Sequence, residues 1–132
     1  MVYHNEPDVY NEIAMFSTAQ WRAVQLGMYN VVNTASNSLN RLYGDLGVKV
    51  AGKTGTAQVS TTHPNNALFV SYAPYENPEI SVVIVIPNGY SSANAAYIGR
   101  EVMGLYFNGE NKEALLSGEV KAGNATNIHI SD

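Results

Sequence analysis

The chain has 132 residues, of which 45% are hydrophobic and 14% are charged, so it is long enough and apolar enough to bury the core of one compact domain. Its net charge of −4 and its lack of a basic cluster make nucleic acid a poor partner. It contains no cysteine, which excludes disulfides and thiolate metal sites.

No segment is long and apolar enough to cross a membrane as a helix. The longest strongly apolar run, ISVVIVI at 80–86, is far shorter than the roughly 20 residues that a spanning helix needs. The first residues, MVYHNEPDVYNE, have neither the basic nor the apolar stretch of a signal peptide. The histidines at 4, 63 and 129 are scattered without metal-ligand spacing, so we predict no metal site and no cofactor.

The first helix is predicted to follow an irregular lead-in over residues 1–16. Ser17 and Gln20 have the spacing of a capping box, in which each side chain accepts a hydrogen bond from the backbone of the other. Phe16 and Trp21 have the spacing of a hydrophobic staple. Together these residues predict a helix that begins just after Ser17.

One face of this helix is predicted to be apolar, because apolar residues recur at helical spacing. They are Trp21, Val24, Met28 and Val31. The pattern fades near Asn33, and the polar residues 34–46 leave room for a single helical turn. Four large side chains of the chain are expected in the core or on a sheet face: Trp21, Met28, Phe69 and Tyr72.

Three strands are predicted in the middle of the chain, at 48–59, 67–75 and 80–86. The second and third are joined by YENP, a turn-forming segment that is short enough for an antiparallel hairpin. The third strand is apolar on both faces, so we expect it at the centre of a sheet that is covered on both sides. It stops at Pro-Asn-Gly, residues 87–89.

A last helix is predicted after Ser92, with Gly109 as its end. Its packed side is expected to carry Ala95, Ile98, Val102 and Leu105. The order of helix, three strands and helix predicts an α+β fold, in which helices pack on an antiparallel sheet of three consecutive strands. We expect residues 1–109 to form the structural unit and residues 110–132 to be a tail that is partly disordered.

The stretch GVKVAGKTGTAQ at 47–58 fits two different motifs. Gly47 to Thr54 match the G-x-x-x-x-G-K-T of a phosphate-binding loop, which requires a helix directly after the Lys-Thr pair. The alternating Val-Lys-Val-Ala and the Gly-Thr-Ala-Gln-Val after Thr54 favour extended chain instead. We therefore predict a strand, and keep a nucleotide-binding protein as a remote alternative.

A strand that carries Lys53, Thr54, Gly55 and Thr56 can bind an acidic peptide. The lysine can hold an acidic group or take part in proton transfer, and the two threonine hydroxyls can donate to a carboxylate. Gly55 lets an extended ligand approach the backbone closely. The backbone N–H of Thr56 can stabilise an oxyanion if the strand lines a cleft.

The K-T-G at 53–55 also carries a family resemblance. AGKTGTAQ, with LGMYNVVN before it and FVSYAPYENPEISVVIVIPNG after it, resembles the C-terminal part of the transpeptidase domain of class B penicillin-binding proteins. QWRAVQLGMYNVV resembles their penicillin-binding protein 2, or elongation, branch. The resemblance implies the serine β-lactamase/transpeptidase-like fold, with residues 1–109 as the C-terminal part of such a domain.

Two other motifs of this family have no counterpart in the chain. No serine is followed three residues later by lysine, so the S-x-x-K nucleophile is missing. The S-x-N motif should lie between that nucleophile and K-T-G. The SLN at 38–40 lies too close to Lys53 and the SAN at 92–94 follows it, so we reject both. We expect the chain to be a fragment that is inactive alone.

The resemblance implies that the parent protein is a serine-type D-Ala-D-Ala transpeptidase that cross-links peptidoglycan stem peptides and is acylated by β-lactam antibiotics. Lys53 and Thr56 would be catalytic: Lys53 would tune the proton shuttle, and Thr56 N–H would form half of the oxyanion hole. Lys53, Thr54, Gly55 and Thr56 would bind the substrate and its terminal carboxylate.

The resemblance also implies a setting for the parent protein. It would be anchored by an N-terminal helix at the extracytoplasmic face of the bacterial cell membrane, and would work with a cell-wall glycosyltransferase. The alternative within the same fold is a non-enzymatic β-lactam-sensing or scaffold domain.

Overall fold

The computed structural model describes residues 16–109 and residue 113, so the expected lead-in over residues 1–15 and nearly all of the expected tail lie outside the described residues. The elements are α1 (Thr18–Asn33), α2 (Ser38–Tyr43), β1 (Ala51–Ala57), β2 (Asn66–Ala73), β3 (Ile80–Ile86) and α3 (Ser92–Asn108). The predicted α+β order is confirmed, and α2 is the short helical turn expected between residues 34 and 46.

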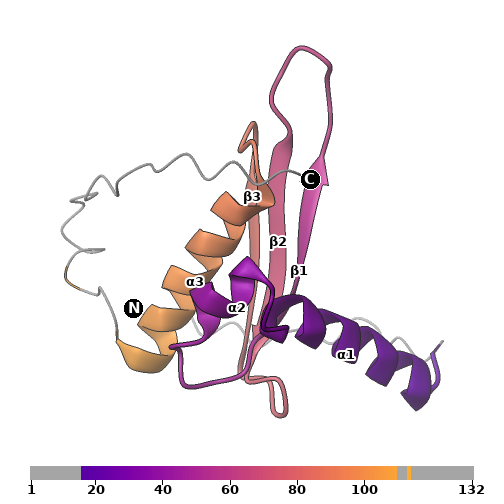
Figure 1. Ribbon diagram of the computed structural model, residues 1–132, viewed down its shortest axis with the longest axis vertical. Coiled ribbons are helices and arrows are strands. Elements are labelled where there is room, and N and C mark those ends of the chain that lie inside the picture. Colours follow the sequence, from indigo (N-terminus) through magenta and orange to yellow (C-terminus); the bar gives the residue numbers. More distant parts are fainter. Residues whose placement is uncertain (1–15, 110–112, 114–132) are drawn as a thin grey trace, which may run out of the picture.

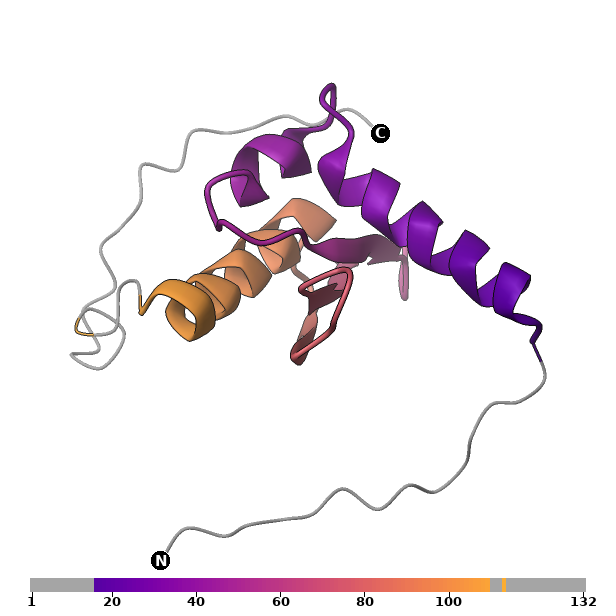
Figure 2. The same ribbon diagram turned by 90° about the horizontal axis from the view of Figure 1, so that it is seen from below.

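The three strands form one antiparallel sheet in the order β1-β2-β3. Phe69 at the middle of β2 lies opposite Thr54 of β1 and Ile84 of β3, which fixes the register of all three strands. α3 lies along one side of the sheet, and α1 crosses near the start of β1 on the other side of the molecule (Figure 1, Figure 2). α2 lies beside α3.

The prediction that the third strand is central is wrong for the described part of the chain. β2 is the central strand, and β3 pairs with β2 alone. Val83 and Val85 point away from α3 and are 67% and 56% exposed. The apolar alternation of β3 suggested two covered faces, but only the face under α3 is covered by residues 16–109.

The core lies between the sheet, α3 and α2. Phe69 is 1% exposed and its ring packs 5.9 Å from the ring of Tyr43. Gly99 lets α3 approach this pair closely, since an added Cβ would lie 3.1 Å from the Phe69 ring. The Tyr43 hydroxyl donates a 2.7 Å hydrogen bond to the Ala96 carbonyl. Burial raises the pKa of Tyr43, so the phenol stays neutral.

α3 packs through a face that only partly matches the predicted one, since Ala95 is buried as expected. Its buried residues are Ala95, Ala96, Gly99, Arg100, Met103 and Gly104. Of the predicted packed side, Ile98 and Val102 are instead 42% and 37% exposed. Small residues allow the helix to approach the sheet, and Arg100 turns inward because its guanidinium donates to Asp45 at 2.8 Å. That bond holds the pKa of the Asp45 carboxyl below its usual range.

The ends of α1 and α3 lie within about one residue of the positions predicted from the sequence. Ser17 and Gln20 form the full capping box of α1, and the rings of Phe16 and Trp21 meet at 5.6 Å. The N-cap of α3 is Ser91 rather than Ser92, while Gly109 ends α3 in the left-handed conformation as predicted. The expected burial of Trp21 is wrong in the described part of the chain, where this residue is 38% exposed.

Candidate active site

The start of β1 is held firmly on both sides. Ala51 and Gly52 are buried, and an added Cβ at Gly52 would lie only 2.7 Å from the Phe69 ring. From α1, the Asn33 amide donates 2.8 Å hydrogen bonds to the carbonyls of Tyr29 and Val50. The C-terminal end of α1 is thereby tied to the residue that precedes the strand, which fixes where β1 begins.

The second half of β1 carries the predicted site residues and is open to solvent. Lys53 and Thr56 are exposed, while Thr54 and Gly55 are half-buried. The Lys53 ammonium donates to the Thr54 carbonyl of its own strand at 2.8 Å. Within the described residues β1 pairs with β2 alone, so its other edge has free backbone N–H and C=O groups.

The side chains of this segment alternate between the two faces of the sheet. Lys53 lies opposite Val70 of β2, on the face turned away from α3. Thr54 lies opposite Phe69 and therefore belongs to the face that packs under α3. Because Lys53 and the two threonines share no face, only a ligand that lies along the free edge of β1 can reach all of them.

Gly55 has tighter surroundings than an open strand position would give. It lies opposite Leu68, and an added Cβ would approach the Leu68 Cβ to 3.3 Å. A side chain there would require Leu68 to shift by a few tenths of an ångström, which is a smaller conflict than the one at Gly52. Gly55 therefore allows β1 to pack closely against Leu68, and it also leaves this part of the strand without a side chain.

The phosphate-loop interpretation of residues 47–54 is not compatible with this fold. Lys53 and Thr54 lie inside β1, which continues to Ala57, and the next element is β2 rather than a helix. A helix N-terminus that could donate N–H groups to phosphates is thus missing from this position. The strand interpretation is the one that the structure supports.

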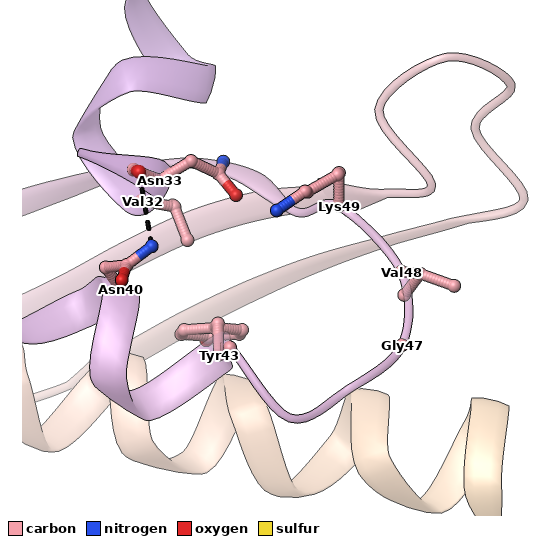
Figure 3. A pocket seen from close by; sticks show the side chains of 8 residues that line it. Val32, Asn33, Asn40, Tyr43, Gly47, Val48 and Lys49 are labelled. Carbon is pink, nitrogen blue, oxygen red and sulfur yellow. Dashed lines mark hydrogen bonds between the residues drawn. The ribbon is translucent and has the colours of Figure 1, made fainter. Parts of the chain in front are cut away.

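A hollow of about 190 Å³ lies beside the segment that leads into β1 (Figure 3). It is lined by Val32, Asn33, Asn40, Tyr43, Gly44, Gly47, Val48 and Lys49. The Asn40 amide donates to the Asn33 carbonyl at 3.2 Å, and the Lys49 ammonium points toward the Asn33 side chain. The hollow could not be predicted from the sequence, because its lining comes from three separate segments, of which only Gly47, Val48 and Lys49 belong to the stretch that fits a phosphate-loop motif.

The loop between β1 and β2 holds a small polar cluster. Ser60 and Thr62 share a 2.9 Å hydrogen bond, and the Thr62 hydroxyl lies 3.1 Å from His63 Nδ1. All of these bonds are exposed and lie within four residues of chain, so they shape the loop (Figure 1). Among the described residues there is neither a metal-binding cluster of acidic, histidine or cysteine side chains nor a helix long and apolar enough to cross a membrane.

The family model of the penicillin-binding protein transpeptidase domain matches residues 1–104, which is most of the chain. The chain belongs to this family. The transpeptidase match includes α1, the K-T-G strand, the hairpin of β2 and β3, and most of α3. The predicted fold, the C-terminal part of a β-lactamase/transpeptidase-like domain, agrees with this match.

Curated relatives of this transpeptidase segment are much longer than the segment itself. It is 38% identical over 120 residues to the peptidoglycan D,D-transpeptidase MrdA of Haemophilus influenzae, covering 80% of this chain and 18% of the relative. It is 36% identical over 124 residues to penicillin-binding protein 2A of Bacillus subtilis, covering 82% of this chain and 17% of the relative. The chain therefore spans under a fifth of the length of these relatives.

Solved structures show the same fold for the transpeptidase segment. The PBP2 of Pseudomonas aeruginosa, crystallised in complex with WCK 5153, superposes with a TM-score of 0.67 at 35% identity, covering 93% of this chain and 26% of that one. Penicillin-binding protein 2B of Streptococcus pneumoniae superposes with a TM-score of 0.61 at 27% identity, covering 74% of this chain and 16% of that one. The PBP2 of Helicobacter pylori, in its complex with MreC, gives a TM-score of 0.59.

Proposed function

We propose that the chain supplies the K-T-G wall of a peptidoglycan D,D-transpeptidase site, and that this site also takes β-lactam antibiotics. The observation that supports this most is the free edge of β1, where Lys53, Thr54 and Thr56 are exposed or half-exposed on a strand whose start is rigidly held. A stem peptide is an extended ligand, and it can lie along such an edge as an added strand.

Each site residue has a separate task in this proposal. The Lys53 ammonium attracts the terminal carboxylate of the peptide. It also lowers the free-energy barrier to proton transfer between the groups beside it. The hydroxyls of Thr54 and Thr56 donate to that carboxylate. The backbone N–H of Thr56 stabilises the oxyanion that forms during acyl transfer. Gly55 keeps the edge free of a side chain where the ligand passes.

The nucleophile of the reaction comes from residues that this chain does not contain. Acyl transfer requires a hydroxyl activated by a neighbouring base, and no serine here has lysine three residues later. We therefore expect the 132-residue chain to form no covalent adduct with a reporter penicillin. Intact-mass spectrometry measures this directly, and a mass gain equal to the drug on any serine would contradict the proposal.

The test of the site itself uses a chimera. Residues 16–109 replace the matching segment of the Haemophilus influenzae D,D-transpeptidase, and acylation by a fluorescent penicillin is followed in time. Lys53→Ala should lower the acylation rate at least about 100-fold, in the range typical of general acid–base groups. The matched control is Lys49→Ala, an exposed lysine four residues earlier and outside β1.

Three outcomes of this experiment are decisive. A slow Lys53→Ala variant beside a normal Lys49→Ala variant supports the assignment. Equal acylation by both variants assigns Lys53 no role, and a folded chimera that acylates nothing favours a non-enzymatic scaffold. The same proposal places the longer protein at the outer face of a bacterial cell membrane, beside a glycosyltransferase that makes the strands to be cross-linked.

A further inference from the structure

Two backbone carbonyls just before β1 accept hydrogen bonds from different parts of the fold. The Lys49 carbonyl accepts a 2.8 Å bond from the N–H of Tyr75, which lies just after β2. The Val50 carbonyl accepts a 2.8 Å bond from the side-chain amide of Asn33, the last residue of α1. Figure 3 shows the Asn33 side chain beside Lys49 at this entrance to β1. The entrance is therefore fixed to the β2–β3 connection and also to a helix outside the sheet.

The two partners of this entrance also contact each other. The ring of Tyr75 packs 4.7 Å from the ring of Tyr29 on α1. The Asn33 amide donates a second 2.8 Å hydrogen bond to the Tyr29 carbonyl. Both N–H groups of this amide are thus in use, which fixes its orientation. The end of α1, the entrance to β1 and the residue after β2 consequently hold one another in place.

The Asn33 amide meets the chain on the edge of β1 that carries the candidate site. Carbonyls an even number of residues apart in an extended strand point to the same edge. The carbonyls of Val50 and Thr54 are four residues apart. Their donors, the Asn33 amide and the Lys53 ammonium, both come from outside β2, so both carbonyls point to the free edge. By the same alternation, the backbone N–H of Thr56 points to this edge as well.

We infer that Asn33 is a positioning residue for the transpeptidase site: by holding the Val50 carbonyl, it sets where the Lys53 ammonium and the Thr56 N–H lie along the free edge. This inference rests on the proposed function of β1. Lys53 lies three residues beyond Val50, about 10 Å along an extended chain, so a displacement of the entrance is carried into the site. Misplacement by about 1 Å can cost about 100-fold in rate.

Pairing with β2 alone cannot fix the open edge of β1. The ladder sets the register of β1 against β2, and within residues 16–109 no strand lies on the other side. The bond from α1 acts on that other side. Lys53 and Thr54 can follow a small displacement by rotating their side chains, whereas a backbone N–H cannot, and an oxyanion donor must lie about 2.7–3.1 Å from the oxygen. Loss of the bond should therefore slow acyl transfer more than it weakens binding.

The chimera described above tests this difference. Acylation followed at several concentrations of fluorescent penicillin gives the rate constant at saturation and the half-saturating concentration separately. Asn33→Ala removes the donor to Val50 and should lower the rate constant about tenfold or more, while the half-saturating concentration changes less than about threefold. The matched control is Asn40→Ala, which should leave both values unchanged. The Asn40 amide donates to the Asn33 carbonyl at the same end of α1, not to the entrance of β1.

Nuclear magnetic resonance of the 132-residue chain gives a readout that does not depend on the chimera. Asn33→Asp keeps the size of the side chain but has no N–H to donate at neutral pH, so the amide resonances of residues 52–56 should move. Asn40→Asp should leave them in place. Lowering the pH protonates the new carboxyl, which can then donate one O–H to the Val50 carbonyl. The resonances should then return toward those of the wild-type chain.

Each outcome decides the inference. A slow Asn33→Ala chimera beside a normal Asn40→Ala chimera supports it, and if the first does not fold, the resonances of residues 52–56 decide in the same way. Equal effects of the Asn33 and Asn40 variants, or a normal rate for Asn33→Ala, overturn it. Lys53→Ala is measured alongside: when it is slow and Asn33→Ala is normal, only this inference fails, and when Lys53→Ala is itself normal, the proposed function fails too.

Discussion

Gly52 and Gly55 lie in the same strand, but an added side chain would meet very different neighbours at the two positions. At Gly52 a Cβ would lie 2.7 Å from the Phe69 ring and 3.1 Å from the Val70 carbonyl. At Gly55 its nearest neighbour would be the Leu68 Cβ at 3.3 Å. The first glycine is required by the core, whereas the second lies where the strand has become accessible.

This difference divides β1 into a tightly packed first half and a more accessible second half. Its first residues belong to the core and are fixed by Phe69 and by the amide of Asn33. Its later residues are supported by the first ones but bury little themselves. Substitutions along β1 should therefore change stability strongly at its start and ligand binding at its end, and the predictions below test that gradient.

Gly52→Val should have the largest effect on stability. A branched side chain cannot fit between the Phe69 ring and the Val70 carbonyl without moving β2 away from β1, and overpacking of this kind costs about 3 kcal/mol or more. Urea denaturation followed by circular dichroism measures the loss. An unchanged midpoint would show that the core adjusts easily and that β1 is not divided as described.

Tyr43→Phe tests the core on the other side of Phe69. It removes the hydroxyl that donates to the Ala96 carbonyl, and should lower the free energy of unfolding by about 1–2 kcal/mol. Because the pKa of Tyr43 is raised in the folded state, its neutral form stabilises the fold below the unfolded value of about 10, and this stabilisation is lost as the pH rises above it.

The pH dependence supplies the control for that substitution. The wild-type chain should lose more stability than Tyr43→Phe between neutral pH and strongly alkaline pH, as measured by denaturation at each pH. Parallel curves for the two proteins would mean that the phenol of Tyr43 ionises without consequence for the fold.

Gly55→Ala should change the free energy of unfolding by less than about 1 kcal/mol, because the small shift of Leu68 is offset by the reduced flexibility of the unfolded chain. In the chimera, the same substitution should slow penicillin acylation, since a methyl group would stand beside the bound ligand. A large loss of stability with normal acylation would assign Gly55 to packing alone.

Lys53→Ala should have the smallest effect on stability, within about 0.5 kcal/mol of the wild-type chain. The side chain is exposed and its hydrogen bond to the Thr54 carbonyl is local. A melting curve of the 132-residue protein is sufficient to measure this. A substantial loss would indicate that the end of β1 supports the fold, and the contrast with Gly52 would then disappear.

Local features of the fold could be predicted from the sequence, and features that depend on distant residues could not. The capping box of Ser17 and the final Gly109 act within a few residues, so both were recognised. The edge position of β3 depends on which strands lie beside it, and its apolar pattern suits a central strand equally well. The packed face of α3 was missed because Arg100 is buried by a bond to Asp45, more than fifty residues away.

The candidate site shows the same division. The residue types of Lys53, Thr54 and Thr56 indicate an acid-binding strand, which stays a prediction; on β1, Lys53 and Thr56 are exposed and Thr54 is half-buried. Their separation onto two faces follows from the period of two in a strand, but the sequence alone cannot predict that the free edge of β1 is the place where one ligand reaches all three. That prediction requires knowledge that β1 is an edge strand, which depends on pairing with β2.

The exposure of α1 has a further consequence, because its first ten residues, 18–27, are all exposed. Among residues 16–109, the capping box and the contact between Phe16 and Trp21 are the interactions that hold that end, while Val32 at the other end is buried. Amide hydrogens near Trp21 should therefore exchange with deuterium through repeated fraying, and protection should rise steeply toward Val32. The rigidity of α1 therefore rises along its length and is greatest at its C-terminal end, where the Asn33 amide donates to the Val50 carbonyl just before β1.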